Sequence, residues 1–310
     1  MFINRILEDD IKEGARYFPV VAILGPRQSG KTTLAQKMFS THRYVSLEEP
    51  DQRTAALTDP RSFLQIHQND FGLIIDEFQY APELLSYIQT MVDKEQKQGF
   101  FILTGSQNFL MNQAITQSLA GRVSLHTLLP LSAQELQASS IMPQEIEDLL
   151  IQGSYPAIYT RNIPPTRLYA QYIKTYIERD VRQLAHVGDL ATFQLFLTMC
   201  AERIGQRINL SEFSRECRIS DQTVKRWMTI LQASYIIFLL QPYEKTLSKR
   251  MVKTAKLFFY DPGIACHLLK IHDAQTLVSS PKRGNIFESF VIAEVIKHAY
   301  NYGKEPSTYF

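Results

Sequence analysis

The chain has 310 residues, which is long enough for two domains. Of these residues 45% are apolar and 21% charged, a composition that is typical of globular proteins. No apolar run approaches the roughly 18 residues of a membrane-spanning helix, and the N-terminus becomes acidic from Glu8 onward, which is wrong for a signal peptide. Three widely spaced cysteines show no metal-ligand pattern, so we expect reduced thiols and a cytoplasmic protein.

The net charge of +2 hides a difference between the two halves of the chain. Residues 1–145 carry 12 basic and 16 acidic residues, whereas residues 146–310 carry 21 basic and 15 acidic residues. A basic second half indicates either an anionic partner or simply well-solvated surfaces.

A phosphate-binding motif follows the first apolar segment. Val20–Leu24 is expected to be a buried strand and Thr33–Phe39 a helix. The residues between them match G-x-x-x-x-G-K-T, and they are Gly25, Pro26, Arg27, Gln28, Ser29, Gly30, Lys31 and Thr32. In such a loop the backbone N–H groups surround phosphates, the lysine contacts the outer phosphates and the threonine binds Mg²⁺. We therefore predict nucleotide contacts from Gly25 to Thr33 at a helix N-terminus.

Two adjacent carboxylates follow a second buried strand, Leu73–Ile75. Beside a phosphate-binding loop, this pattern favours Asp76 as a ligand of Mg²⁺ and Glu77 as the base that polarises the attacking water. An acidic strand end that meets only solvent is the alternative. The side-by-side arrangement is typical of hydrolases rather than kinases.

The segment Gly99–Asn108 is expected to be a third buried strand with a polar end. Because ligands of parallel sheets lie beyond the carboxyl ends of the strands, Thr104, Ser106 and Gln107 are placed to sense the γ-phosphate, with Ser106 as the candidate catalytic residue. Ser106 could equally cap a helix. Arg122, after a predicted helix at 109–119, could act on a neighbouring subunit or merely neutralise that helix end.

The order of these motifs, followed by Leu129-Pro130-Leu131-Ser132-x-x-Glu135 and Gly153-x-x-Pro156, resembles the AAA+ ATPases. Within them it is similar to a bacterial and archaeal group with a C-terminal winged-helix and restriction-endonuclease-like region of unknown function. The resemblance implies ATP as the nucleotide and a contact of Pro156 with adenine, although an ordinary turn would also explain Gly153 and Pro156. Ser132 and Glu135 form a capping box by sequence alone.

A helix-turn-helix pattern occupies residues 209–231, with Val224, Trp227, Met228 and Leu231 on one apolar stripe. The outward residues of the second helix are candidates for contact with double-stranded DNA, and they are Gln222, Thr223, Lys225 and Arg226. The basic segment Lys245–Lys256, between two apolar strands, is a second candidate for the same contact. A winged helix that docks a protein is the alternative.

The last segment, from Gly284 to Ile296, resembles the first helix of the nuclease-like module. Glu288 and Glu294 lie six residues apart, so they point to different sides of a helix and make no metal site.

We thus predict an α/β protein: an AAA+ type P-loop ATPase domain with a parallel sheet at 1–135, a helical lid at 136–190, a mostly helical winged-helix domain at 191–270 and an incomplete nuclease-like α/β segment at 271–310. The expected activity is ATP hydrolysis with Mg²⁺ that moves the winged helix, with DNA, a protein or a second copy of the chain as partner and no membrane. A slow nucleotide-dependent switch that docks proteins is the alternative, and a DNA-binding module gated by ATP is a third.

Overall fold

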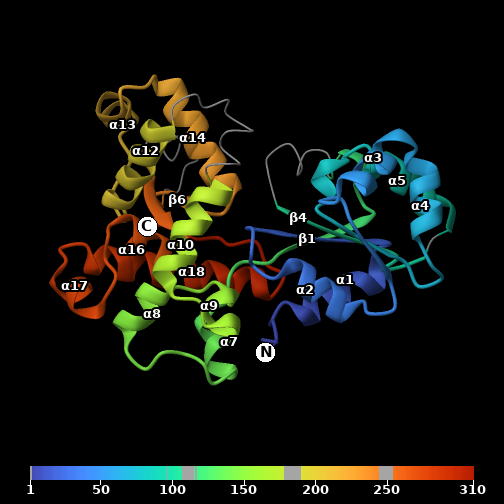
Figure 1. Cartoon of the computed structure of the whole chain (residues 1–310), viewed down its shortest axis with the longest axis horizontal. Helices are drawn as coiled ribbons and strands as arrows, with labels where there is room; N and C mark the ends of the chain where they lie inside the picture. The colour runs from blue at the N-terminus through green and yellow to red at the C-terminus, as the bar shows by residue number, and fades with distance from the viewer. Residues whose placement is uncertain (1, 96, 107–114, 116, 178–189, 244–253) are drawn as a thin grey trace. The chain divides into compact units, whose positions relative to one another are not determined.

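The computed structural model describes residues 2–95, 97–106, 115, 117–177, 190–243 and 254–310. It divides into two compact units (Figure 1). The first comprises Asn4–Leu129 with Tyr300–Lys304, and the second comprises Met1–Ile3, Pro130–Ala299 and Glu305–Phe310.

The first unit is built on a five-stranded sheet with the order β2-β3-β4-β1-β5, in which every pairing is parallel. The strands are β1 (Val20–Gly25), β2 (Arg43–Ser46), β3 (Leu73–Asp76), β4 (Phe101–Ser106) and β5 (Val123–Thr127). The parallel sheet confirms the predicted α/β class of this part. β1 lies between β4 and β5, so its C-terminal end is flanked by the C-terminal ends of these two strands.

Helices cover both faces of this sheet, which is why β1 and β3 are buried at every position rather than at alternate ones. Side chains of Val21 and Ile23 pack toward α1 and α2, whereas Val20, Ala22 and Leu24 pack with α3, α4 and α5 (Figure 1). The helices are α1 (Glu8–Tyr17), α2 (Lys31–Met38), α3 (Pro50–Thr58), α4 (Pro60–His67), the short 3₁₀ helix η1 (Phe78–Tyr80) and α5 (Leu84–Glu95).

The second unit is mostly helical around one large apolar core. Its elements are α7 (Ala133–Ala138), α8 (Ile146–Gln152), α9 (Pro156–Arg161), α10 (Pro165–Tyr172), the π-helical turn η2 (Ile173–Ile177), α12 (Leu190–Glu202), α13 (Leu210–Cys217), α14 (Asp221–Ala233), β6 (Ile237–Leu240), β7 (Lys256–Phe259), α16 (Pro262–Leu268), α17 (Ala274–Ser279) and α18 (Arg283–Asn301). The predicted capping box is confirmed, because Ser132 and Glu135 exchange side-chain and backbone hydrogen bonds at the start of α7.

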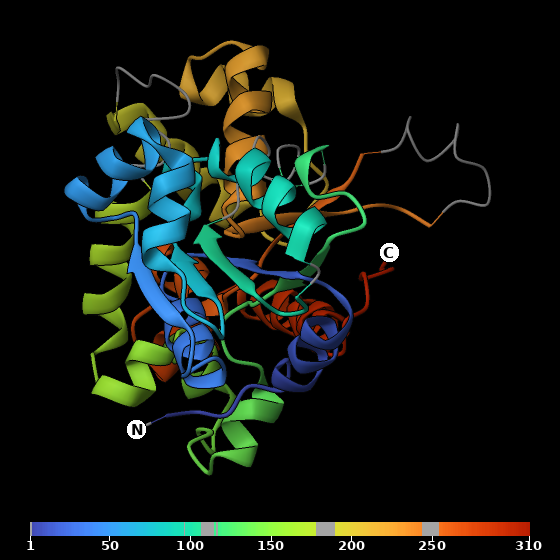
Figure 2. The ribbon, with the colours of Figure 1, turned by 90° about the vertical axis from the view of Figure 1, so that its right-hand side faces the viewer.

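The helix-turn-helix pattern yields two helices, α13 and α14, joined by Arg218 in the left-handed conformation. Figure 2 shows α13 and α14 close together beside α12. The apolar stripe is buried as predicted, from Val224 to Leu231. β6 and β7 then pair antiparallel. This order of elements is the predicted one, whereas a winged-helix domain as such stays a prediction.

Other predicted segments fall partly outside the described residues. They are Gln107 with most of the helix expected at 109–119, residues 178–189 of the predicted helical lid, and the part of the basic segment up to 253. None of the helices in the described ranges is long and apolar enough to cross a membrane.

The last helix separates its two acidic residues, as the spacing predicts. Glu288 pairs with Lys256 at 3.2 Å, whereas Glu294 accepts a hydrogen bond from the backbone of Ala133 and pairs with Lys297 at 2.8 Å. In the described part of the chain, no three His, Cys, Asp or Glu side chains gather as a metal site would require. The nuclease-like resemblance therefore stays without structural support, and the finer division of residues 136–310 into three domains stays a prediction.

Candidate nucleotide-binding site

The loop between β1 and α2 has the backbone shape that phosphate binding requires. Gly25 has φ of +151°, Gln28 +61° and Gly30 +96°. A Cβ at Gly25 would overlap the carbonyl oxygen of Leu128, so only glycine fits there. Gly30 caps α2 without a side chain, so the first-turn N–H groups of the helix face the loop without an acceptor from their cap residue. This arrangement suits an anion at the helix N-terminus.

Lys31 is buried at the first position of α2. Its Nζ donates hydrogen bonds to the carbonyl oxygens of Gly25 at 3.1 Å and Pro26 at 2.7 Å, which fold the side chain back over the loop. Burial lowers the pKa of Lys31 to about 8, against the opposing effect of Glu77 and Asp76, whose charges favour the ammonium. A bound phosphate would add a negative charge to this group.

Asp76 is the point at which the loop and the strand ends meet. Its carboxylate lies at the end of β3 and accepts hydrogen bonds from Thr32 of α2 at 3.0 Å and from Tyr44 of β2 at 3.0 Å. Thr104 of β4 donates a third hydrogen bond to it. The predicted metal residues Thr32 and Asp76 are thus in direct contact, although 44 positions separate them in the sequence.

The donor set fits Mg²⁺. A carboxylate and a hydroxyl beside a phosphate loop are hard oxygen ligands, and Mg²⁺ is usually held by one or two such side chains while phosphate oxygens and water complete its shell. Asp76 and Thr32 are therefore the residues that would hold the ion.

Glu77 follows β3 in the left-handed conformation, with φ of +54°. Its carboxylate accepts a hydrogen bond from the side-chain amide of Gln79, and the same amide donates to the Ser106 hydroxyl at 3.0 Å. The candidate base and the candidate sensor at the end of β4 are thus joined through Gln79.

The structure places two other predicted site residues, Arg122 and Pro156, on other elements. Arg122 is half-buried and pairs with Asp93 of α5, with Nη2 2.9 Å from Oδ2, which raises the pKa of the guanidinium. Pro156 begins α9 in the second unit, three residues after Gly153, which has φ of +68°. The trans role of Arg122 and the adenine contact of Pro156 stay predictions.

The structure adds three residues that the sequence reasoning missed. Arg5 is buried and donates from Nη1 to the carbonyl of Ser29 at 2.9 Å and from Nη2 to that of Leu129 at 2.7 Å, so it supports the loop from behind. Tyr44 and Gln79 contact Asp76 and Glu77. Burial and the neighbouring Asp76 raise the pKa of Tyr44, so its hydroxyl stays a donor. No sequence motif marks these three residues. Tyr44 reaches the site because β2 pairs with β3, Gln79 lies in η1 after β3, and Arg5 lies just before α1.

The DNA-facing candidates lie on α14 of the second unit. Gln222, Lys225 and Arg226 are exposed and Thr223 is half-buried, where it donates its backbone N–H to the cap residue Ser220. Of the basic segment, the described Lys256 begins β7 and pairs with Glu288.

Comparisons with known proteins agree with this geometry. A family model described as an AAA domain matches residues 17–137, and one described as a domain of unknown function (DUF8612) matches residues 143–275. Uncharacterized proteins of Mycobacterium bovis and Mycobacterium tuberculosis are each 30% identical over 281 residues, which are 89% of this chain. The chain spans 62% of the length of these curated relatives.

Among solved structures, a Walker-type ATPase of Pyrococcus abyssi superposes with a TM-score of 0.57 at 16% identity, over 86% of this chain and 96% of that one. At this identity the likeness concerns the fold. Residues 17–137 thus match the AAA domain model, and the chain shares its fold with a Walker-type ATPase.

Proposed function

We propose that the protein binds ATP with Mg²⁺ and hydrolyses it. The observation that carries this proposal is the hydrogen bond between Thr32 and Asp76, which joins the phosphate loop to the end of β3. The AAA domain match supports the same activity.

In the proposed reaction, the first-turn amides of α2 and the Lys31 ammonium bind the phosphates. Thr32 and Asp76 hold the ion, which when bound neutralises charge on the phosphates. Glu77 accepts a proton from the attacking water, and Ser106, held by Gln79, lies next to that carboxylate.

A slow switch that acts through protein docking is the second candidate. The Gln79 amide favours it, because the Glu77 carboxylate is already engaged by a protein donor and must exchange that contact to act on water. In this case nucleotide binding itself would change the state of the second unit.

We propose further that the second unit follows the nucleotide state and is the part that contacts the partner. The exposed side chains of Gln222, Lys225 and Arg226 on α14 favour double-stranded DNA, because phosphate contacts come from such polar and basic groups.

The first experiment is steady-state ATP hydrolysis by the full chain, with and without double-stranded DNA, at two salt concentrations. We expect turnover that DNA stimulates at low salt and that loses this stimulation at high salt. Slow turnover that is indifferent to DNA would instead support the protein-docking switch.

Two variants separate binding from chemistry. Glu77→Gln is expected to bind ATP as the parent does and to lose at least about a hundredfold in turnover, since it cannot accept the proton. Lys31→Ala is expected to lose binding itself. Undiminished hydrolysis by Glu77→Gln would remove Glu77 from the catalytic role.

A further inference from the structure

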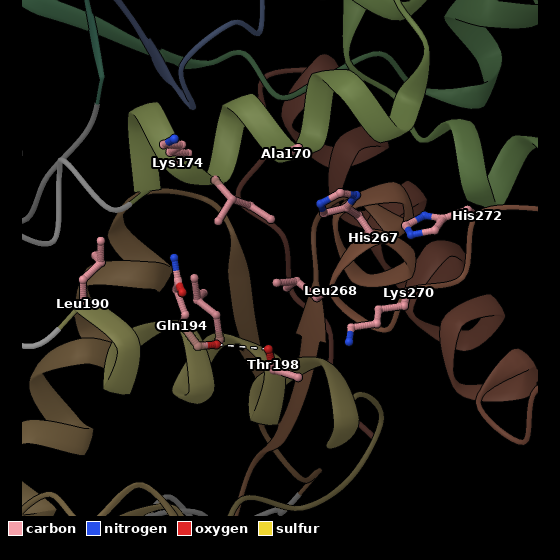
Figure 3. Close-up of a pocket in the computed structure, with 11 residues that line it drawn as sticks. Ala170, Lys174, Leu190, Gln194, Thr198, His267, Leu268, Lys270 and His272 are labelled. Carbon is pink, nitrogen blue, oxygen red and sulfur yellow. Dashed lines mark hydrogen bonds between the residues drawn. The ribbon is translucent and has the colours of Figure 1, made fainter.

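The second unit contains a cavity of about 670 Å³ that the nucleotide site does not use. Figure 3 shows its arrangement: α10 with the turn η2 runs along one side, α12 along the other, and the end of α16 with the residues after it closes the space. The described lining residues all belong to the second unit. Its volume lies in the range of roughly 300–1,000 Å³ that small-molecule sites occupy.

The titratable side chains among the described lining residues are all basic. Lys174 and Lys270 contribute ammonium groups from opposite elements, and His267 and His272 contribute imidazoles whose ring centroids are 5.5 Å apart. No acidic side chain is among the described residues that line the cavity. Asp273, the acidic neighbour of His272, is engaged at the start of α17 by the backbone and the hydroxyl of Thr276.

The imidazole of His267 is set up as a neutral hydrogen-bonding group. Burial, and then the nearby His272, lower its pKa, so at neutral pH it stays uncharged. Its Nδ1 is buried and has no hydrogen-bond partner among the described atoms. A buried polar atom without a partner is costly, and such atoms often mark a place where a ligand or water belongs.

Gln194 and Thr198 of α12 are neutral polar residues, and the rest of the described lining is apolar. Ile173 and Leu197 are buried, and Leu268 is half-buried and lies between His267 and Lys270 in the lining. A cavity with an apolar wall and cationic groups on two of its sides matches a molecule with two parts: a hydrocarbon or aromatic body and one negative group.

We propose that this cavity binds an organic anion whose apolar body lies against Ile173, Leu197 and Leu268, while the charges of Lys174 and Lys270 attract its carboxylate or phosphate. This site is separate from the proposed ATP site in residues and in chemistry. Its ligand would make the second unit a receptor for a small molecule.

The test is calorimetric titration of the full chain with sodium octanoate, octyl phosphate, 1-octanol and sodium acetate, all below micelle-forming concentrations. Octanoate or octyl phosphate is expected to bind with a stoichiometry of one. The alcohol lacks the charge and acetate lacks the body, so each is expected to bind at least about tenfold more weakly. Whichever anion binds more tightly identifies the head group.

Variants then locate the binding. Lys174→Gln and Lys270→Gln are each expected to weaken octanoate binding about tenfold, and the double variant more than either. Lys304→Gln, which removes the same charge from an exposed position, is the matched control and should bind as the parent does. Trp227 packs against Phe193 and Phe196 of α12, so its fluorescence checks that each variant keeps this helix in place.

Three results would overturn the proposal: no binding of either anion at millimolar concentration, equal affinity for 1-octanol and octanoate, or undiminished octanoate binding by the correctly folded double variant. None of these results bears on ATP hydrolysis, so the two proposals fail independently.

Discussion

Asp76 is surrounded by three hydroxyl donors that come from α2, β2 and β4. Each donor stabilises the ionised carboxylate and fixes its orientation. The carboxylate therefore already has its position before an ion binds, and the hydroxyl of Thr32 can exchange its hydrogen bond for coordination without a large movement. This pre-organisation follows from strand register, because Asp76 is the partner of Thr104 and of Ser46 in the neighbouring strands.

Substitution of Gln79 tests how the candidate base Glu77 is positioned. Because its amide joins Glu77 to Ser106, we expect it to position the base, and Gln79→Ala should lower the turnover number about tenfold with little change in KM. Gly105→Ala should have a similar effect by another route, since its Cβ would overlap the Gln79 amide and approach the Phe78 ring to 3.1 Å.

Steady-state kinetics of both variants, with the exposed Gln65→Ala as control, would check this expectation. A rise in turnover would mean that Gln79 restrains Glu77 instead, and it would favour the slow-switch candidate.

At the scale of elements, α1 and β5 are joined by a buried polar contact. His126 of β5 lies 2.7 Å from Asp10 through Nδ1 and 2.9 Å from the Ser124 hydroxyl through Nε2. Gly14 of α1 lies directly over these two β5 side chains, where a Cβ would overlap Ser124. The helix thus approaches the strand closely enough for its first turn to supply the acidic partner.

This contact predicts acid sensitivity. Burial lowers the pKa of His126 below its usual 6.5, and this effect outweighs the opposing one of Asp10. The unfolded chain therefore takes up a proton more readily than the folded one, so the free energy of unfolding falls as the pH drops below about 6.5, by up to about 1.4 kcal/mol per pH unit. The stabilisation by neutral His126 is fully retained above that pH.

Urea unfolding at pH 5, 6 and 7.5 would measure this dependence. His126→Gln is expected to flatten it, whereas His298→Gln, which removes an exposed imidazole, should leave it unchanged. An unaltered slope in His126→Gln would assign the acid sensitivity to other groups.

Elements were predictable from sequence where one physical cause dominated. β1, β3 and β4 follow from apolar runs, and α14 follows from the spacing of Val224, Trp227, Met228 and Leu231. β2 was missed because it is a short edge strand in which Val45 alone is buried. The P-loop was predictable because its backbone shape demands glycine at fixed positions, whereas Tyr44, Gln79 and Arg5 reach the site only through tertiary packing, which no local pattern encodes.

At the scale of the whole molecule, the structure groups residues 130–299 in one unit, and Lys297 shows how it is held together. This buried side chain donates to the carbonyl of Leu131 at 3.0 Å, to the Ser154 hydroxyl at 2.9 Å and to Glu294 at 2.8 Å. Ser154 in turn donates its backbone N–H to Asp261, which is the N-cap of α16. Burial raises the pKa of the Asp261 carboxyl, and the charge of Lys297 opposes this effect. One ammonium group thus connects the start, the middle and the last helix of the unit.

Replacing this group should therefore affect the second unit as a whole. Lys297→Met keeps most of the side-chain volume but leaves three acceptors without their donor and removes the positive charge that favours the ionised form of Asp261. We therefore expect a loss of about 3 kcal/mol in the free energy of unfolding. Lys225→Met on the exposed face of α14 removes the same charge and should cost less than about 0.5 kcal/mol. Hydrogen exchange would locate the effect: faster exchange is expected in α8, α16 and α18, while the strands of the sheet keep the protection of the parent. Equal stability of the two variants would show that the packing of α18, rather than its buried charge, holds the unit together.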